Sequence, residues 1–138
     1  MTETRIPSVL FVCQKNGGKS QMAAALLRAA AGDTVTVHSA GTKPGAALNA
    51  QSVESLAQLG VDVGDEHPKL ITAEMLAAAD VVVVLGTEAK VDEVPGTTFE
   101  TWITDEPYER GIQGMERMRL VRDDIRARVD ELLARLQG

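Results

Sequence analysis

One short stretch of the sequence, Cys13 to Ser20, gathers residue types that can do chemistry together: the chain's only cysteine, two adjacent glycines and two lysines. The apolar run Val9–Val12 before it predicts a buried strand, and the alanine- and leucine-rich run after it predicts a helix capped by Ser20. A strand–loop–helix unit directs several backbone N–H groups and the positive end of the helix dipole toward one point. We therefore predict an oxyanion-binding loop with a thiol at its mouth.

The cysteine is the most informative residue of this loop. A helix N-terminus and nearby cations favour the thiolate, which is the reactive form of a cysteine. We expect Cys13 to be a nucleophile, Lys19 to be the nearby cation and Ser20 to donate its hydroxyl proton toward the sulfur. The residues expected to bind the oxyanion are Gln14, Lys15, Asn16, Gly17, Gly18 and Lys19. The alternative is a small buried cysteine that only fills space.

The spacing Cys13-x5-Lys19, followed directly by Ser20, resembles the Cys-x5-Arg-Ser signature of low-molecular-weight protein tyrosine phosphatases and of the arsenate reductases built on the same fold. Asn16 and the preceding strand agree with that pattern, whereas Lys19 stands where the family has arginine. The run from Ser39 to Thr42 resembles the Ser-Ala-Gly-Thr that ends the family's second strand. The resemblance implies that Ser39 lies near Asn16 and helps to hold the loop, and an ordinary turn is the alternative.

The same stretch also comes within one residue of a nucleotide-binding P-loop. The pattern Gly-x4-Gly-Lys-Ser ends at Ser20, but it needs a glycine where Cys13 stands. The apolar run Val81–Leu85 does not end in the aspartate that would favour this alternative.

A proton donor is expected on a different loop. The resemblance places a general acid after the last strand, just before a proline. Here the sequence is Asp105-Glu106-Pro107, with one inserted residue. We assign the general acid to Asp105, with Glu106 as the second candidate and a solvated turn as the alternative.

Strands and helices alternate along the chain around these residues. Periodicity predicts strands at Val35–Ser39, Val81–Leu85 and Thr98–Trp102 in addition to the first, and helices at Gln21–Ala31, Gln51–Leu59, Thr72–Ala79 and from Met115 onward. Such alternation predicts an α/β fold with a parallel sheet. We expect a single three-layer domain over residues 1–138, with four strands in the order 2-1-3-4, which agrees with the resemblance. A switch point beside the first strand is where ligands bind in such sheets.

Composition limits the classes of function. The 138 residues carry a net charge of −6, which argues against a nucleic-acid partner, and no apolar run is long enough for a membrane span. One cysteine excludes an intramolecular disulfide and an all-cysteine metal site, and it fits a reducing cytoplasm. We expect a cytoplasmic protein with no metal and no bound cofactor.

Because Lys19 stands where the family signature has arginine, the expected reaction moves from phosphate ester hydrolysis toward arsenate reduction. Lysine supplies one point charge where a guanidinium clamps two oxygens, and phosphoryl transfer depends on such a clamp. Arsenate esters exchange more readily, which favours an arsenate reductase over a phosphatase. Because the chain lacks further cysteines, an external low-molecular-weight thiol must take up the arsenate. The resemblance is to the arsenate–mycothiol transferase branch, with mycothiol as co-substrate.

A mycoredoxin- or glutaredoxin-like protein would then release arsenite from the conjugate. Glutathione is the alternative thiol in another host. The alternative functions are a low-molecular-weight protein tyrosine phosphatase, a nucleotide-binding protein and an anion-binding module without turnover.

Overall fold

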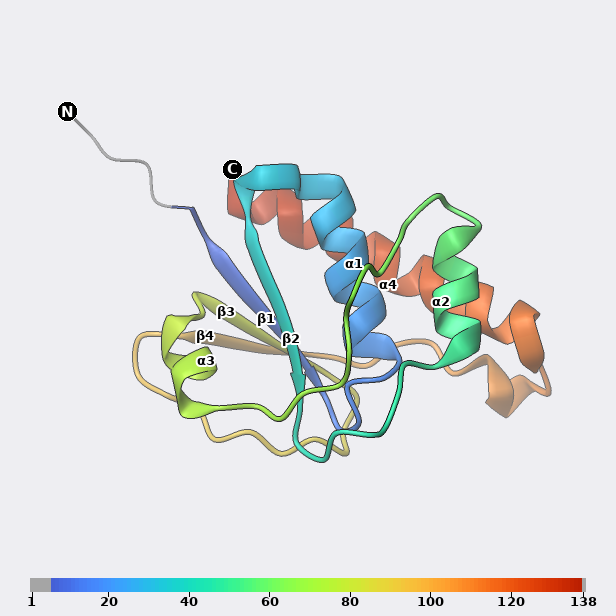
Figure 1. The fold of residues 1–138 in the computed structure, drawn as a ribbon, viewed down its shortest axis with the longest axis horizontal. Helices are drawn as coiled ribbons and strands as arrows, with labels where there is room; N and C mark the ends of the chain where they lie inside the picture. The colour runs from blue at the N-terminus through green and yellow to red at the C-terminus, as the bar shows by residue number, and fades with distance from the viewer. Residues whose placement is uncertain (1–5, 138) are drawn as a thin grey trace.

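The structure is a computed structural model that describes residues 6–137. Residues 1–5 and 138, which the single-domain prediction also covers, lie outside the described range. All the described strands belong to one sheet, and the helices pack against it (Figure 1).

Four parallel strands form the sheet, in the order β2-β1-β3-β4. Their bounds are β1 Ser8–Cys13, β2 Thr36–Gly41, β3 Val81–Leu85 and β4 Thr98–Trp102. The two central strands are almost wholly apolar because helices or loops cover both of their faces. The predicted fold class and strand order are confirmed.

Helices cover the two faces of the sheet unequally. One face carries α1 Lys19–Ala31, α2 Ala50–Ala57 and the long α4 Gly114–Gln137, and the other carries only the short α3 Ala73–Ala78 with its neighbouring loops (Figure 1). Short 3-10 helices occupy Gly32–Thr34 and Pro107–Arg110. The predicted helices are therefore present, with ends that differ by a residue or two.

The core is divided between the two faces in the same way. Under α1 and α4, Phe11, Met22 and Ile125 are fully buried, and the Phe11 and Trp102 rings lie 5.7 Å apart. On the opposite face Leu10 and Val82 form a smaller cluster that α3 helps to cover. The molecule thus has three layers, as predicted, with most of its apolar contacts on the side that anchors α1.

The parallel arrangement brings the loops after the strands to one edge of the sheet. In the register of β1 with β2, Cys13 lies opposite Gly41. A single bridge between Gly41 and Leu70 brings the segment before α3 to the same edge. The predicted oxyanion-binding loop, residues 13–20, is called the catalytic loop below. It meets the loop after β2 and the loop after β4 beyond the ends of the strands, where open α/β sheets bind ligands.

The first turn of α1 differs from its prediction. The helix begins at Lys19 with Gly18 as its cap residue, and Ser20 lies inside the first turn. The Met22 N–H donates to the Gly18 carbonyl at 2.9 Å. The prediction that Ser20 caps the helix is wrong, because its hydroxyl is used in contacts with the catalytic loop.

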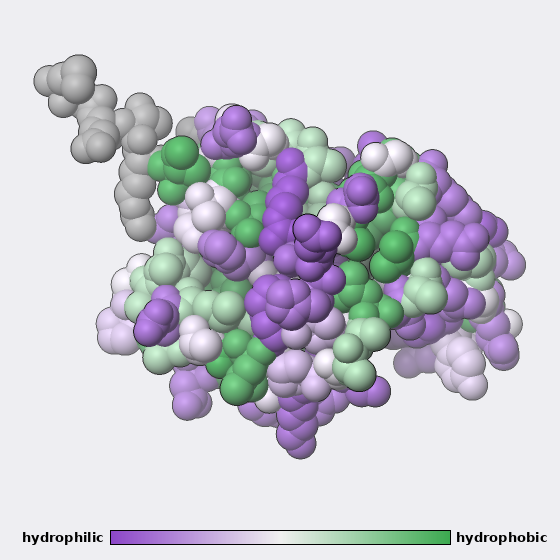
Figure 2. Space-filling view, in the orientation of Figure 1, coloured by the Kyte–Doolittle hydropathy of each residue, from purple (hydrophilic) through white to green (hydrophobic). Residues whose placement is uncertain are grey.

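Within residues 6–137, no helix has the length and apolarity needed to cross a bilayer. Hydrophilic side chains are spread over the face that Figure 2 presents, with hydrophobic ones scattered among them.

Candidate active site

Cys13 ends β1, and its sulfur is held at the mouth of the loop. The Sγ atom lies 2.9 Å from Ser20 Oγ and accepts the Asn16 backbone N–H at 3.2 Å. The residue is partly buried, so the sulfur is within reach of a small ligand but is fixed by its neighbours.

The contacts of Ser20 fix the direction of its hydroxyl. The Asn16 side-chain amide donates to Ser20 Oγ at 2.8 Å, and an amide nitrogen can only donate. The single proton of Ser20 therefore remains available to point at Cys13 Sγ. Two donors, one hydroxyl and one backbone N–H, then converge on the sulfur, an arrangement that stabilises a thiolate.

Asn16 is the hub of the loop. It is fully buried and has a positive φ of 52°, the only such value among the described non-glycine residues. Its side-chain oxygen accepts the Gln21 amide at 3.1 Å and the Lys69 backbone N–H at 3.0 Å. Gln21 also donates to the Asn16 carbonyl at 3.2 Å and to the His67 carbonyl at 3.1 Å. These bonds hold a backbone conformation that L-residues rarely adopt.

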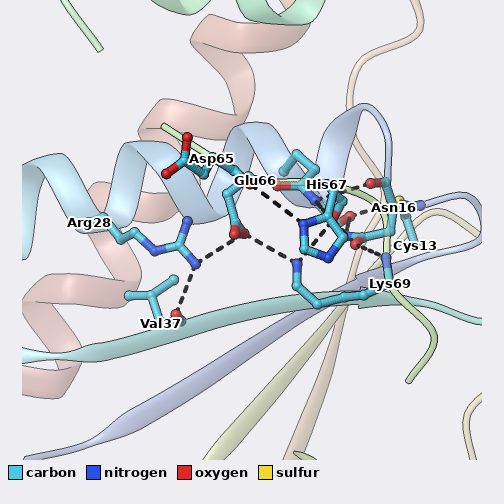
Figure 3. A network of polar contacts seen from close by, with 10 residues as sticks. Cys13, Asn16, Arg28, Val37, Asp65, Glu66, His67 and Lys69 are labelled. Carbon is cyan, nitrogen blue, oxygen red and sulfur yellow. Dashed lines mark hydrogen bonds and ion pairs between the residues drawn. The ribbon is translucent and has the colours of Figure 1, made fainter. Parts of the chain in front are cut away.

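A charged network supports this hub from the segment before α3 (Figure 3). Glu66 accepts Lys69 Nζ at 3.2 Å and Arg28 at 3.4 Å, and Arg28 also donates to the Val37 carbonyl at 3.0 Å. Lys69 Nζ also donates to the His67 carbonyl at 3.2 Å. The network links α1 and β2 to the residues that contact Asn16.

Gly41, at the end of β2, allows the loop to approach the sheet closely. A Cβ at this position would lie 2.7 Å from the Gln14 carbonyl oxygen and 2.9 Å from Asn16 Cβ. Both contacts are too short for real atoms, and one is with backbone that cannot easily move. The glycine of the Ser-Ala-Gly-Thr motif is thus the residue that the loop requires.

Ser39 belongs to the same motif and is fully buried. Its hydroxyl has no hydrogen-bond partner among the described residues. The Asn16 side chain is hydrogen-bonded to Gln21, Lys69 and Ser20, and the predicted supporting role of Ser39 stays a prediction.

Lys19 lies at the start of α1 and points toward the loop after β4. Its ammonium forms an ion pair with the Glu106 carboxylate, whose second oxygen lies 3.9 Å from Arg117. These three residues line a cleft of about 410 Å³. A cation and a carboxylate thus meet beside the loop that carries Cys13.

Asp105, the predicted general acid, is paired with Arg110 and does not line this cleft. Arg110 donates to both of its carboxylate oxygens, at 2.7 and 3.0 Å, and holds the pKa of this carboxyl below its usual range. The structure brings Glu106, the second candidate, to Lys19 and leaves Asp105 in a surface ion pair. The choice of general acid between the two stays a prediction.

Sequence reasoning missed the residues that hold the loop. Neither Lys69, whose backbone N–H contacts Asn16, nor Gln21, which is 2% exposed, was among the predicted site residues. A polar residue in the alanine- and leucine-rich run that predicts the helix was the available signal for Gln21. The contact of Lys69 depends on the bridge to Gly41, which no local pattern indicates.

Comparison with known proteins finds a matching family model and several similar proteins. The family model described as low molecular weight phosphotyrosine protein phosphatase matches residues 8–138. A putative arsenate reductase of Halobacterium salinarum is 30% identical over 127 residues, covering 88% of this chain and 87% of the relative. An arsenate reductase of Bacillus subtilis is 32% identical over 132 residues, covering 89% and 92% of the two chains.

Solved structures share the fold. A thioredoxin-dependent arsenate reductase of Corynebacterium glutamicum superposes with a TM-score of 0.84 at 31% identity, and the match covers 99% of this chain but 64% of that one. An arsenate reductase in the phosphate-binding state gives a TM-score of 0.80 at 26% identity, covering 94% and 98%. These matches favour the thiolate site over the nucleotide-binding alternative.

Proposed function

Since the chain belongs to the low-molecular-weight phosphotyrosine protein phosphatase family, we propose that it is an arsenate reductase in which the Cys13 thiolate attacks arsenic and an external thiol takes up the arsenate. The observation that carries the proposal is the convergence of two donors, from Ser20 and Asn16, on the chain's only thiol. The names of the relatives support arsenate as the substrate.

Binding of the oxyanion begins with an exchange at Lys19. In the structure its ammonium is neutralised by Glu106. An incoming arsenate dianion competes with this carboxylate for Lys19, while the N–H groups at the start of α1 contribute further positive potential. The exchange leaves the Glu106 carboxyl next to the bound anion.

In the first chemical step the thiolate forms a bond to arsenic, and one arsenic–oxygen bond breaks. The departing oxygen leaves as water when it receives a proton. In this proposal Glu106, once displaced from Lys19, takes up a proton from solvent and supplies it to that oxygen. The oxidation state of arsenic does not change, and Cys13 holds the arsenate as a thioester-like adduct.

In the second step the sulfur of an external thiol attacks arsenic, and the bond from arsenic to Cys13 breaks. The proton of the thiol returns to Glu106, and the free Cys13 thiolate is restored. An external thiol is needed because the chain holds no second cysteine to form an internal disulfide. We propose mycothiol as this thiol on the resemblance to the arsenate–mycothiol transferase branch. Glutathione remains the alternative.

Reduction follows outside the loop. A thiol of a mycoredoxin- or glutaredoxin-like protein attacks the sulfur of the conjugate, a disulfide forms, and arsenic receives the electron pair and leaves as arsenite. The similar arsenate reductase of Corynebacterium glutamicum is thioredoxin-dependent, so thioredoxin is a second candidate partner.

Mass spectrometry of the reaction products tests this proposal. Arsenate and the protein are incubated with mycothiol, glutathione or reduced thioredoxin in parallel. We expect a thiol–arsenate conjugate with mycothiol and none in a Cys13→Ser control. Formation of a conjugate with glutathione alone would identify glutathione, not mycothiol, as the co-substrate. Absence of any thiol-dependent product would contradict the proposed reaction.

A protein tyrosine phosphatase is the second candidate function, favoured by the family description itself. Lys19 argues against it, since a lysine cannot clamp two oxygens of a transferring phosphoryl group. Hydrolysis of an aryl phosphate without any thiol distinguishes the two.

A further inference from the structure

A second cavity, which the proposed reaction does not use, opens on the β2 side of the catalytic loop. It has a volume of about 580 Å³ and lies between the catalytic loop and the loop after β2. Among the described residues, the only charged ones that line it are Lys15 and Lys43, and the rest of its wall is small or polar: Gly17, Gly18, Pro44, Gly45, Ala46, Ala47 and Asn49. We call this cavity the lysine groove.

Neither lysine of the groove has a carboxylate partner in the described part of the chain. By contrast, Lys19 is paired with Glu106 and Lys69 with Glu66. Both Lys15 and Lys43 are exposed. Two unpaired cations beside an anion site are notable in a chain with a net charge of −6, because the overall field repels an anionic substrate.

The groove is already formed by hydrogen bonds between the two loops. The Lys43 N–H donates to the Gln14 carbonyl at 2.8 Å, the Gly45 N–H to the Lys15 carbonyl at 2.9 Å, and the Asn49 N–H to the Gly17 carbonyl at 2.7 Å. The backbones are close enough that a Cβ on Gly17 would lie 3.0 Å from the Ala47 carbonyl oxygen. The two lysines therefore lie on two loops whose backbones are hydrogen-bonded to each other.

We infer that the lysine groove is an entry site for the tetrahedral oxyanion, where Lys15 and Lys43 capture it before it passes to the loop around Cys13. The inference rests on the proposed function only in taking an oxyanion as the substrate. Charge complementarity identifies the occupant, since two ammonium groups attract a dianion strongly at short range and low ionic strength.

The cleft on the opposite side of the loop does not offer such an entrance. Glu88, Glu106 and Glu109 line it together with Lys19 and Arg117, so its carboxylates outnumber its cations. An anion that approaches from that side meets net negative charge. The two sides of the catalytic loop thus differ in sign, and the lysine groove is the favourable path.

The experiment measures anion affinity without relying on turnover. Inorganic phosphate and arsenate are titrated as protectants of Cys13 against iodoacetamide, a neutral reagent that the lysine charges do not attract. In the Lys15→Gln/Lys43→Gln double variant we expect the dissociation constants of both anions to rise about 5- to 20-fold at about 20 mM ionic strength. The difference should fall below about 2-fold in 0.5 M salt, because screening removes the attraction.

Two control variants separate charge from structure. Lys90→Gln removes the same charge from a groove on the α3 side, lined also by Asp92, Glu93 and Glu100, and should change the dissociation constants by less than about 2-fold. Lys15→Arg/Lys43→Arg keeps both charges and should retain the native affinity. The thermal midpoint of each variant shows that the fold is intact.

Two results would overturn the inference: unchanged anion affinity of the double glutamine variant at low salt, or an affinity loss that persists in 0.5 M salt. Phosphate serves as a probe even if arsenate is never reduced, so failure of the proposed function and failure of this inference are distinguishable.

Discussion

The two loops that frame the active site are held in different ways. The catalytic loop is fixed from within, since Asn16 and Ser20 are fully buried and hydrogen-bonded to each other and to their neighbours. The loop after β4 is fixed from outside, by ion pairs whose carboxylates are well exposed: the Asp105 side chain is 36% exposed and that of Glu106 is 39% exposed.

The two ways of holding a loop suit two different tasks. Buried hydrogen bonds are costly to break, which suits a loop that must present its donors in one geometry. Exposed ion pairs contribute little to stability and exchange readily with solvent ions. A carboxylate held in this way can give up Lys19 to a substrate anion and then act on it. In the proposed reaction, a rigid loop that binds the anion thus works together with a carboxyl that the anion can displace.

The largest expected effect comes from the rigid loop. Cys13→Ser should abolish arsenate turnover, because a serine hydroxyl is a far weaker nucleophile than a thiolate. Ser fits the site, so circular dichroism and the thermal midpoint should stay close to those of the native protein. Retention of most of the rate would end the thiolate hypothesis.

Substitution in the acid loop should be nearly as damaging, but at one carboxylate only. We expect Glu106→Gln to lower turnover by on the order of 10²–10⁴-fold, the usual contribution of a positioned general acid. Asp105→Asn is the matched control, and it should lower turnover less than about 10-fold because Asp105 is paired with Arg110. Steady-state rates of the two variants decide between the carboxylates, and the opposite ranking would restore the assignment made from the sequence.

A change at the base of the rigid loop should have an intermediate effect. Gly41→Ala places a Cβ 2.7 Å from the Gln14 carbonyl oxygen and should displace the loop, with a loss of turnover of roughly 10- to 100-fold. Gly45→Ala is the control, since its Cβ would meet nothing closer than 3.9 Å. Anion titrations of both variants check the geometry, and equal affinities would mean that the loop tolerates the shift.

Substitution of Lys19 tests whether the catalytic loop favours arsenate or an aryl phosphate as substrate. Lys19→Arg should raise activity on an aryl phosphate more than it raises arsenate turnover, since arginine restores the two-point grip. Lys19→Met should damage both activities because the cation is lost. The measurement compares the rates of the native protein, Lys19→Arg and Lys19→Met on arsenate and on an aryl phosphate. If the native protein hydrolyses aryl phosphate efficiently and Lys19→Arg is no faster, the phosphatase function is favoured instead.

The smallest effect concerns the edge of the sheet. Arg135 donates to both carboxylate oxygens of Glu100 on β4, which lowers the pKa of Glu100. A lowered pKa in the folded state gives stability that is present above the unfolded pKa and is lost as the pH falls through the folded value. Glu100→Gln should therefore lower the thermal midpoint by about 1–3 °C at pH 7. The difference should shrink as the pH falls and Glu100 becomes protonated, and a constant difference would exclude the ion pair as its cause.

The sequence predicted the sheet better than it predicted the long-range contacts around the site. The strands Val81–Leu85 and Thr98–Trp102 have the predicted bounds, because apolar runs between turn residues are strong local signals. Cys13 and Ser20 lie together because one strand–loop–helix unit positions both. Glu106 and Lys69 depend on contacts over 87 and 53 residues of sequence, which no local pattern encodes.

The most direct test of the proposed reaction is the production of arsenite from arsenate and an external thiol, followed by separation of the two arsenic species, in the native protein and in Cys13→Ser. We expect arsenite to form only with the native protein, the thiol and a mycoredoxin-type reductant together, with one disulfide per arsenite. Arsenite formation by Cys13→Ser at the native rate, or none by the native protein with any thiol or redoxin, would contradict it.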